Sequence, residues 1–397
     1  MMLSKKALSI NPSPTMAIDS KAKEMKSQGL DVIGFGAGEP DFDTPEHIRE
    51  AAFKAINEGH TRYTPAAGTL ELKEAVAAKL KRENGLSYEP NQIVISNGAK
   101  HSLSNIFTAL LNPGDEVMIP VPYWVTYPEL VSLNDGVPVV LETSEDNNFK
   151  VTIEDLEKNT GNKAKALVLN SPCNPTGQIY SEEELHRIAN FCSEHNIYII
   201  SDEIYEHLIY GNHRQTSTAS FSEKAKEITI IVNGVSKSYA MTGWRIGYTA
   251  SAPNIAKVMS SIQSHTASNP NAVAQKAALA ALNGPQECVE EMRVAFDKRR
   301  KYMYEQVIAI PHLHALEPQG TFYMFVSIKE TIGKTFNGTS ISSSDDFSSL
   351  LLENQKVAVV PGTGFGAPNY IRLSFATSMD NIVEGLRRIG SFVDDLK

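Results

Sequence analysis

A lysine, a serine and an arginine gather in one short segment of this 397-residue chain, residues 228–248. The segment opens with a β-branched apolar run, 228–232, which is typical of a buried strand, and Ser236 and Lys237 follow soon after it. Arg245 comes eight residues after the lysine. Lysine forms Schiff bases with carbonyl groups, arginine binds phosphate oxygens through its planar fork, and serine adds a neutral donor. The segment therefore favours a site for a carbonyl compound that carries a phosphate. A lysine exposed in a connecting turn is the alternative.

An acid stands at the end of a second apolar run, IYIIS at 197–201. A buried carboxylate costs free energy unless it is paired, so Asp202 indicates a cationic partner, such as the protonated nitrogen of a bound ring. Tyr205, three residues later, could donate a hydrogen bond to the same ligand. The alternative for Asp202 is that it caps a following helix.

A third candidate is a turn that would bind phosphate. The apolar run 93–96 is followed by Asn97, Gly98, Ala99 and Lys100, and then by a helical pattern. The first turn of a helix has backbone N–H groups without helical acceptors, and these groups bind phosphate well. Many α/β connections share this pattern, so by itself it is weak evidence for a phosphate site. Ser236 and Arg245, which could also bind a phosphate, strengthen the prediction.

Composition excludes several classes of function. The chain has 37 basic and 46 acidic residues, a net charge of −9 and no basic run, so nucleic acid and anionic membranes are poor partners. Cys173, Cys192 and Cys288 lack metal-ligand spacing and are typical of reduced thiols in a cytosol. There is no signal-peptide pattern and no run of 18 apolar residues. We therefore expect a cytoplasmic enzyme without a metal ion.

The elements that must position these residues alternate along the chain, which predicts an α/β fold with a mostly parallel, helix-covered sheet. Helical patterns cover 45–58, 70–84 and a long charged stretch, 285–310, that would link two domains. The stretch 337–346, NGTSISSSDD, predicts a flexible surface loop. The expected strands lie near 93–96, 117–121, 137–141, 166–170, 197–201, 228–233 and 246–250.

Six motifs spread along the chain resemble those of the class I pyridoxal-phosphate-dependent aminotransferases, and most of all the bacterial aspartate aminotransferase branch. They are GEPDFDTP from Gly38, NPTG from Asn174, SDEIY from Ser201, SKSYAMTGWRIGY from Ser236, PGTGFG from Pro361 and YIRLSFA from Tyr370. The resemblance implies the aspartate-aminotransferase-like fold: a large domain, 46–288, that carries a seven-stranded sheet and the cofactor, and a smaller α+β domain formed by 1–45 and 289–397.

The resemblance also implies a role for each motif residue. Lys237 would bind pyridoxal 5′-phosphate covalently and shuttle a proton, with Asp202 and Tyr205 as the other catalytic groups. The cofactor would further contact Gly98, Ala99, Lys100, Trp124, Asn174, Ser236, Arg245 and, from the partner subunit of a homodimer with shared sites, Tyr63. The substrate would contact Gly38, Trp124, Asn174, Lys100 and Arg372, the last by a bidentate grip on the α-carboxylate.

The expected reaction is transfer of the amino group of L-aspartate to 2-oxoglutarate in a ping-pong cycle. The best-known branch of the family binds the distal carboxylate with a partner arginine, but no arginine occurs between Arg245 and Arg293, so Lys100 is the candidate cation. Relatives that accept prephenate carry a basic residue where this chain has Asn11, so we do not expect prephenate as a substrate. Aromatic amino-acid preference and a pyridoxal-phosphate-dependent lyase are the open alternatives. A ligand-sensing module would need a DNA-binding domain, and the segment before residue 30 is too short for one.

Overall fold

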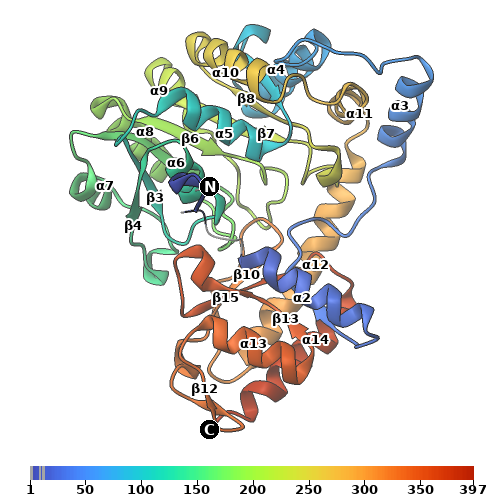
Figure 1. Ribbon diagram of the computed structural model, residues 1–397, viewed down its shortest axis with the longest axis vertical. Helices are drawn as coiled ribbons and strands as arrows, with labels where there is room; N and C mark the ends of the chain where they lie inside the picture. The colour runs from blue at the N-terminus through green and yellow to red at the C-terminus, as the bar shows by residue number, and fades with distance from the viewer. Residues whose placement is uncertain (1–2, 9, 11–13) are drawn as a thin grey trace.

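The computed structural model describes residues 3–8, 10 and 14–397. Figure 1 shows a larger upper lobe built on one sheet and a smaller lower lobe that contains the C-terminus. The upper sheet has seven strands in the order β2-β8-β7-β6-β5-β3-β4. All neighbouring strands are parallel except that β8 runs antiparallel to both β2 and β7. The strands are β2 Ile93–Ser96, β3 Glu116–Pro120, β4 Val137–Leu141, β5 Ala164–Asn170, β6 Tyr198–Asp202, β7 Thr229–Gly234 and β8 Gly247–Ala250. The mostly parallel α/β sheet predicted from the sequence is confirmed.

Alternate residues of the central strands pack on opposite faces of this sheet, as the pleat requires. On β5, Ala166 and Val168 belong to one apolar cluster together with Phe107, whereas Leu167 belongs to a second cluster together with Leu185. Helices therefore cover both faces, and the strands are continuous apolar runs. The helices of this lobe are α3 Glu46–Asn57, α4 Leu70–Asn84, α5 Ala99–Leu110, α6 Thr126–Leu133, α7 Ile153–Asn159, α8 Glu182–His195, α9 Glu223–Ile228, α10 Pro253–Thr266 and α11 Ala272–Asn283.

The lower lobe contains an antiparallel sheet of four strands in the order β14-β15-β10-β9. These strands are β9 His314–Ala315, β10 Tyr323–Ser327, β14 Val360–Pro361 and β15 Tyr370–Ser374, and helices α13 Ser344–Gln355 and α14 Met379–Asp394 complete the lobe. Near the N-terminus, β1 (Ile33–Gly34) pairs in parallel with β13 (Val357–Ala358), and α2 (Pro14–Ser27) lies beside them. The pairing places β1 and α2 in the lobe that contains the C-terminus, whereas residues 5–8 lie beside α6 of the upper lobe (Figure 1).

Helix α12, Glu287–Ala309, joins the two lobes, as Figure 1 shows. Near its start, Val289 packs into a cluster that includes Ile48 and Leu72 of the upper lobe. Further along, Phe296 and Met303 pack into the main cluster of the lower lobe. The linking helix expected over 285–310 is therefore present, while the domain bounds 46–288 and 289–397 stay a prediction.

The loop predicted over 337–346 is wrong. Strands β11 (Thr335–Phe336) and β12 (Thr339–Ser340) form a hairpin, and α13 begins at Ser344. Asn337 and Gly338 both have positive φ, 49° and 85°, which is the pattern of a two-residue hairpin turn. The segment was predicted as a loop from its many serines, although Asn-Gly is itself a signal for a hairpin turn.

The remaining elements are short. Helix α1 covers Lys5–Leu8, and 3-10 helices occur at Pro90–Gln92, Glu145–Asn147, Thr218–Ser220, Thr242–Trp244, Lys329–Thr331 and Gly362–Phe365. Within the part of the chain that the structure describes, no helix has the length and apolar character needed to cross a membrane.

Candidate active site

Lys237 lies in the turn that follows β7, at the edge of the sheet where the parallel strands end. Its Nζ donates a hydrogen bond to the carbonyl oxygen of Gly38 at 2.5 Å and lies 5.9 Å from the centre of the Tyr205 ring. Burial lowers the pKa of the Lys237 amine to about 8; Glu39 opposes this shift, and the nearby charges of Arg372 and Arg245 add to it. An amine that loses its proton near pH 8 is a good nucleophile toward a carbonyl carbon.

The predicted phosphate turn is present at the start of α5. Gly98 has a φ of 85° and precedes the helix directly, and the Arg245 guanidinium donates to the Asn97 carbonyl oxygen at 3.3 Å. A Cβ atom on Gly98 would lie 2.3 Å from Arg245 Nη2, and one on Gly247 would lie 2.4 Å from the Ala99 nitrogen. The two glycines therefore let the arginine and strand β8 approach the helix N-terminus closely. Ser236, buried, follows β7 two residues after it ends.

Asp202 ends β6 and is 3% exposed. Its carboxylate accepts hydrogen bonds from the Tyr127 hydroxyl at 2.7 Å and from the Ile204 backbone at 3.3 Å. Burial raises the pKa of Asp202 to about 6, although the Tyr127 hydrogen bond favours the ionised form. The residues after it form a turn and not a helix, so the alternative role of Asp202 as a helix cap is wrong.

Arg372 extends from β15 of the lower lobe and is 2% exposed. It donates to Asn174 Oδ1 at 2.9 Å and to the Gly36 carbonyl oxygen at 3.2 Å, and its guanidinium lies 4.1 Å from the centre of the Tyr323 ring. Its buried Nε has no hydrogen-bond partner. Among the described residues, no carboxylate lies within ion-pair distance of it. A buried cation with a spare donor fits an anionic ligand.

Trp124 and Lys100 lie together beside this group. Lys100 Nζ is 5.0 Å from the centre of the Trp124 ring, and Trp124 packs edge to face against Tyr127. Burial, together with the charge of Arg245, lowers the pKa of Lys100. Trp124, Tyr127 and Asn174 also line one small pocket, so the indole lies in the same part of the structure as the amide.

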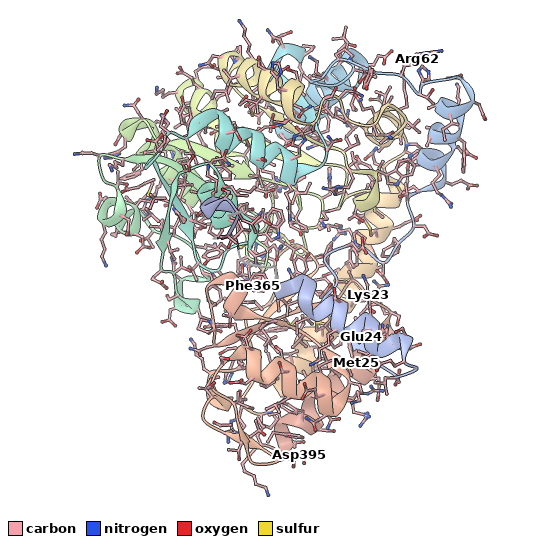
Figure 2. The ribbon with its side chains drawn as sticks, in the orientation of Figure 1. Lys23, Glu24, Met25, Arg62, Phe365 and Asp395 are labelled. Carbon is pink, nitrogen blue, oxygen red and sulfur yellow. The ribbon has the colours of Figure 1, made fainter. Side chains whose placement is uncertain are left out.

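In Figure 2 the labelled Phe365 lies where the two lobes meet, and its ring lies 5.2 Å from the Arg372 guanidinium. Arg62, which directly precedes Tyr63, is labelled at the outer edge of the upper lobe. Tyr63 is 91% exposed. Within one chain, the structure therefore does not bring Tyr63 to the other candidate residues. Asn11 lies outside the described residues.

Two tyrosines of the site were missed in the sequence. Tyr127 is buried on α6 and donates to Asp202. Tyr323, on β10, places its hydroxyl 3.2 Å from that of Tyr205. A buried tyrosine hydroxyl usually has a hydrogen-bond partner, so a tyrosine in an apolar segment predicts one. The sequence does not show which residue that partner is.

Nearly the whole chain is similar to known aminotransferases. The family model for aminotransferase class I and II matches residues 30–389. The chain is 50% identical over 394 residues, 99% of each protein, to the aspartate aminotransferase of Bacillus subtilis. It is 48% identical to the probable aspartate/prephenate aminotransferase of Aquifex aeolicus, over 98% of this chain and 97% of the relative. Among solved structures, the aspartate aminotransferase from Thermus thermophilus with maleate is 42% identical, with a TM-score of 0.93 over 99% of this chain and all of that one. These matches over nearly the full length show that the chain belongs to the class I and II aminotransferase family.

Proposed function

We propose that this aminotransferase holds pyridoxal 5′-phosphate at Lys237 and transfers the amino group of L-aspartate to 2-oxoglutarate. The observation that carries the proposal is the position of Arg372, a buried cation with an unpartnered Nε and no acid within ion-pair distance among the described residues, near Lys237. A substrate carboxylate would complete the hydrogen bonding of the arginine, and the lysine amine would then face the carbon that carries the amino group.

The residues present fit the cofactor. Its phosphate matches the turn at Gly98 and the Arg245 guanidinium. Its ring nitrogen, when protonated, would supply the positive partner that the buried Asp202 carboxylate lacks, and Tyr205 and Asn174 would hold the phenolic oxygen. When bound, the cofactor supplies a ring that withdraws electrons from the substrate carbon. Each of these roles is the one that the matching motif residue has in class I aminotransferases.

The chain's own residues then divide the work. Arg372, held by its hydrogen bond to Asn174, orients the substrate through the α-carboxylate. Lys237 Nζ takes the proton from the substrate α-carbon and later returns one, which its pKa of about 8 permits near neutral pH. Trp124 would provide a flat apolar face for the ring and exclude water from that side.

The first test is a half reaction. The purified protein is loaded with pyridoxal phosphate and mixed with aspartate alone, and the absorbance of the aldehyde form of the cofactor is followed. The expected result is conversion to the amine form with release of oxaloacetate, and Lys237→Ala should not convert. Ammonia release with cofactor turnover in the absence of a 2-oxo acid would instead favour a lyase.

Lys100 is the proposed ligand of the distal carboxylate, and the maleate in the Thermus thermophilus structure's title is itself a dicarboxylate. A charge-assisted hydrogen bond contributes about 1.5 to 3 kcal/mol, so Lys100→Ala should lower kcat/KM for aspartate roughly 10 to 100-fold. Phenylalanine should be used at nearly the same rate by both proteins. Prephenate is the third substrate to compare, and Lys163→Ala, an exposed lysine of the same lobe, is the control. An equal loss with all three substrates would show that Lys100 is structural.

We also propose a homodimer in which Tyr63 completes the phosphate site of the partner. Tyr63 is 91% exposed, and Phe53, Ile56 and Leu70 around the same loop are 66%, 51% and 57% exposed, so apolar side chains gather beside it. Mixing Tyr63→Phe chains with Lys237→Ala chains should produce one intact site per heterodimer. A monomer at micromolar concentration by sedimentation would contradict the proposal.

We also propose how the domains move and in which compartment the protein works. Residues 46–288 would move as one domain against 1–45 and 289–397 when substrate binds, because Lys237 and Arg372 lie on different lobes. The protein would work in the cytoplasm, which its free Cys173, Cys192 and Cys288 suit.

A further inference from the structure

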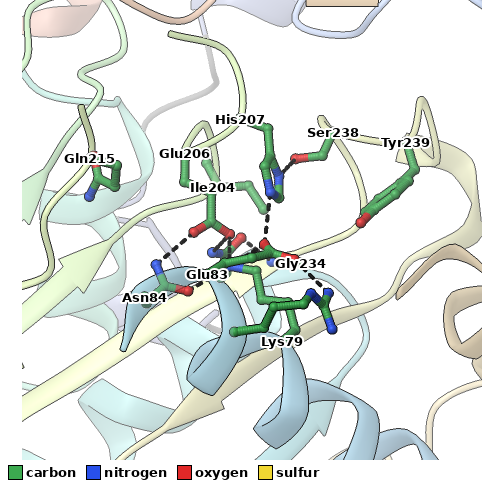
Figure 3. Close-up of polar contacts among 12 residues, drawn as sticks. Lys79, Glu83, Asn84, Ile204, Glu206, His207, Gln215, Gly234, Ser238 and Tyr239 are labelled. Atoms are coloured by element: carbon green, nitrogen blue, oxygen red, sulfur yellow. Dashed lines mark hydrogen bonds and ion pairs between the residues drawn. The ribbon is translucent and has the colours of Figure 1, made fainter. Parts of the chain in front are cut away.

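A second group of polar side chains contacts the turn that carries Lys237, through Ser238. Figure 3 shows these residues reaching toward one another from α4, from the segment after β6 and from the lysine turn. We call them the rear cluster: Lys79, Glu83, Asn84, Glu206, His207, Asn233 and Ser238. None of them is assigned a part in the proposed reaction.

One chain of hydrogen bonds in the rear cluster leads to the residue next to the lysine. His207 Nε2 lies 3.0 Å from Glu83 Oε2, and His207 Nδ1 lies 2.8 Å from Ser238 Oγ. A carboxylate only accepts, so Nε2 carries the hydrogen that Glu83 receives. In the neutral ring Nδ1 is then an acceptor, and the Ser238 hydroxyl donates to it. The order is that of a serine, histidine and acid relay, but Ser238 is 2% exposed and has no access to a substrate.

The other half of the rear cluster holds His207 in place. Glu206, directly before it, receives hydrogen bonds from Lys79, from Asn84 at 3.0 Å and from Asn233 at 2.6 Å. Asn233 in turn accepts from the Gly234 backbone at 2.7 Å, at the end of β7. The strand that leads to the lysine turn is therefore bonded, through Asn233, to the residue that directly precedes His207.

The carboxylates of Glu83 and Glu206 and the ring of His207 come close enough to suggest a cation site, since their ligand atoms lie within 4.8 Å of one another. Lys79 already supplies the cation. Its ammonium pairs with Glu206, lies 3.4 Å from Glu83 and donates to Asn84 Oδ1 at 2.9 Å. Arg82 also pairs with Glu83, at 2.6 Å, so the two carboxylates are compensated by two cations of the same chain.

We propose that His207 is a positioning residue for Lys237, acting through the hydroxyl of Ser238. The inference rests on the proposed function of Lys237 as the cofactor lysine. Ser238 and Tyr239 follow the lysine directly, and each has an anchor: Ser238 contacts His207, and Tyr239 donates to Gln286 at 2.8 Å, just before α12. With one anchor removed, the turn can rotate, and the Lys237 amine no longer holds the orientation seen toward Gly38.

The experiment compares Ser238→Ala, His207→Ala and the double variant with wild type. The cofactor-free proteins are mixed with pyridoxal phosphate, and covalent attachment at Lys237 is followed by borohydride trapping and mass spectrometry. A misplaced reacting group costs up to about 100-fold in rate, so each single variant should attach the cofactor roughly 10 to 100-fold more slowly. The pH midpoint of the absorption band of the loaded protein should also shift, and kcat should fall while KM for aspartate stays unchanged.

The double variant and a matched control make the result specific. Because His207 and Ser238 act in one chain, the double variant should attach the cofactor no more slowly than either single variant. His186→Ala is the control, since His186 lies on α8 and contacts Asn190 at the surface. Glu83→Gln keeps an acceptor for the ring and should fall between the control and His207→Ala. Ser238→Ala removes one oxygen atom only, so it tests the idea even where His207→Ala folds poorly.

Three outcomes would overturn the proposal. First, Ser238→Ala and His207→Ala could keep the wild-type attachment rate and pH midpoint and lose only thermal stability, which would show that both residues are purely structural. Additive losses in the double variant would show that the two residues act separately. Retention of zinc by the wild-type protein after dialysis would show that the rear cluster binds a metal. If Lys237→Ala itself still attached the cofactor covalently at the wild-type rate, the proposed function would fail instead.

Discussion

Two polar groups at the lysine turn have opposite electrostatics. In the first, which we call the site group (Asp202, Lys237 and Arg372), burial raises the pKa of Asp202 to about 6 and lowers that of Lys237 to about 8. In the rear cluster the pKa of Glu83 is about 2: burial raises it, but the hydrogen bond from His207 and the charge of Lys79 outweigh burial. Burial thus favours the neutral forms of Asp202 and Lys237, whereas the partners of Glu83 favour its charged form.

Depth alone does not explain the difference, because Asp202 is 3% exposed and Glu206 is 9% exposed. The number of partners does. Glu206 has three donors from its own chain, and its pKa is lowered despite burial because of Lys79, His207 and Asn84. Arg372 has a donor without a partner. Because this unpartnered donor is charged and lies near Lys237, we expect a ligand carboxylate to supply its partner.

The largest expected effect comes from breaking the rear cluster. Lys79→Met removes the buried cation and leaves Glu206 uncompensated, which should lower the free energy of unfolding by about 3 to 5 kcal/mol. Denaturant unfolding of the cofactor-free protein measures it. Lys81→Met, an exposed lysine on the same helix, is the control and should change little. Equal unfolding free energies of the two variants would show that Lys79 does not stabilise the rear cluster, and the contrast with the site group would be lost.

Asp202→Asn should do the reverse in the site group. Activity should fall by on the order of 3 kcal/mol, or more than 100-fold, because the protonated ring nitrogen loses its carboxylate partner. The unfolding free energy of the cofactor-free protein at pH 8 should not fall, since the buried carboxylate is uncompensated there. Near-normal turnover, or a loss of stability as large as that of Lys79→Met, would contradict this prediction.

Glu203 sharpens the comparison because it borders the rear cluster but lacks its compensation. It is fully buried, its Oε2 has no partner, and burial together with Glu206 raises its pKa from 4.5 to about 7. The folded chain therefore binds more protons than the unfolded chain between these values, and stability is lost as pH rises from about 4.5 to about 7.

Replacing this carboxylate with an amide should remove that loss. Glu203→Gln should stabilise the protein by about 2 kcal/mol at pH 8 and by little near pH 4.5. Unfolding curves at the two pH values check it, with the exposed Glu183→Gln as control. The same change at both pH values would show that Glu203 is not protonated in the folded state.

Tyr127→Phe is the smallest expected effect. Its hydroxyl stabilises the ionised Asp202, so its loss should raise the pKa of that carboxyl further. One hydrogen bond to a charged group contributes about 1.5 kcal/mol, so activity at neutral pH should fall roughly tenfold. The acid limb of the kcat/KM profile should move to higher pH. A loss that is the same at every pH would mean that Tyr127 only packs against Trp124.

The sequence by itself determined the strands and the residues that follow them. Apolar runs ending in Asp202 and before Lys237 locate β6 and β7, because burial on both faces of a parallel sheet requires continuous apolar residues. The motifs of the lysine turn, the NPTG loop and Arg372 were also readable locally. The hairpin at Asn337 was missed although its signal was local.

Only the tertiary structure decided which side chains meet. Arg372 and Asn174 are 198 residues apart, Lys79 and Glu206 are 127 apart, and Tyr127 and Asp202 are 75 apart. Such pairs depend on strand order and on the packing of one lobe against the other, neither of which a local pattern contains. The shifted pKa values have the same origin, because they depend on burial and on charges brought from distant segments.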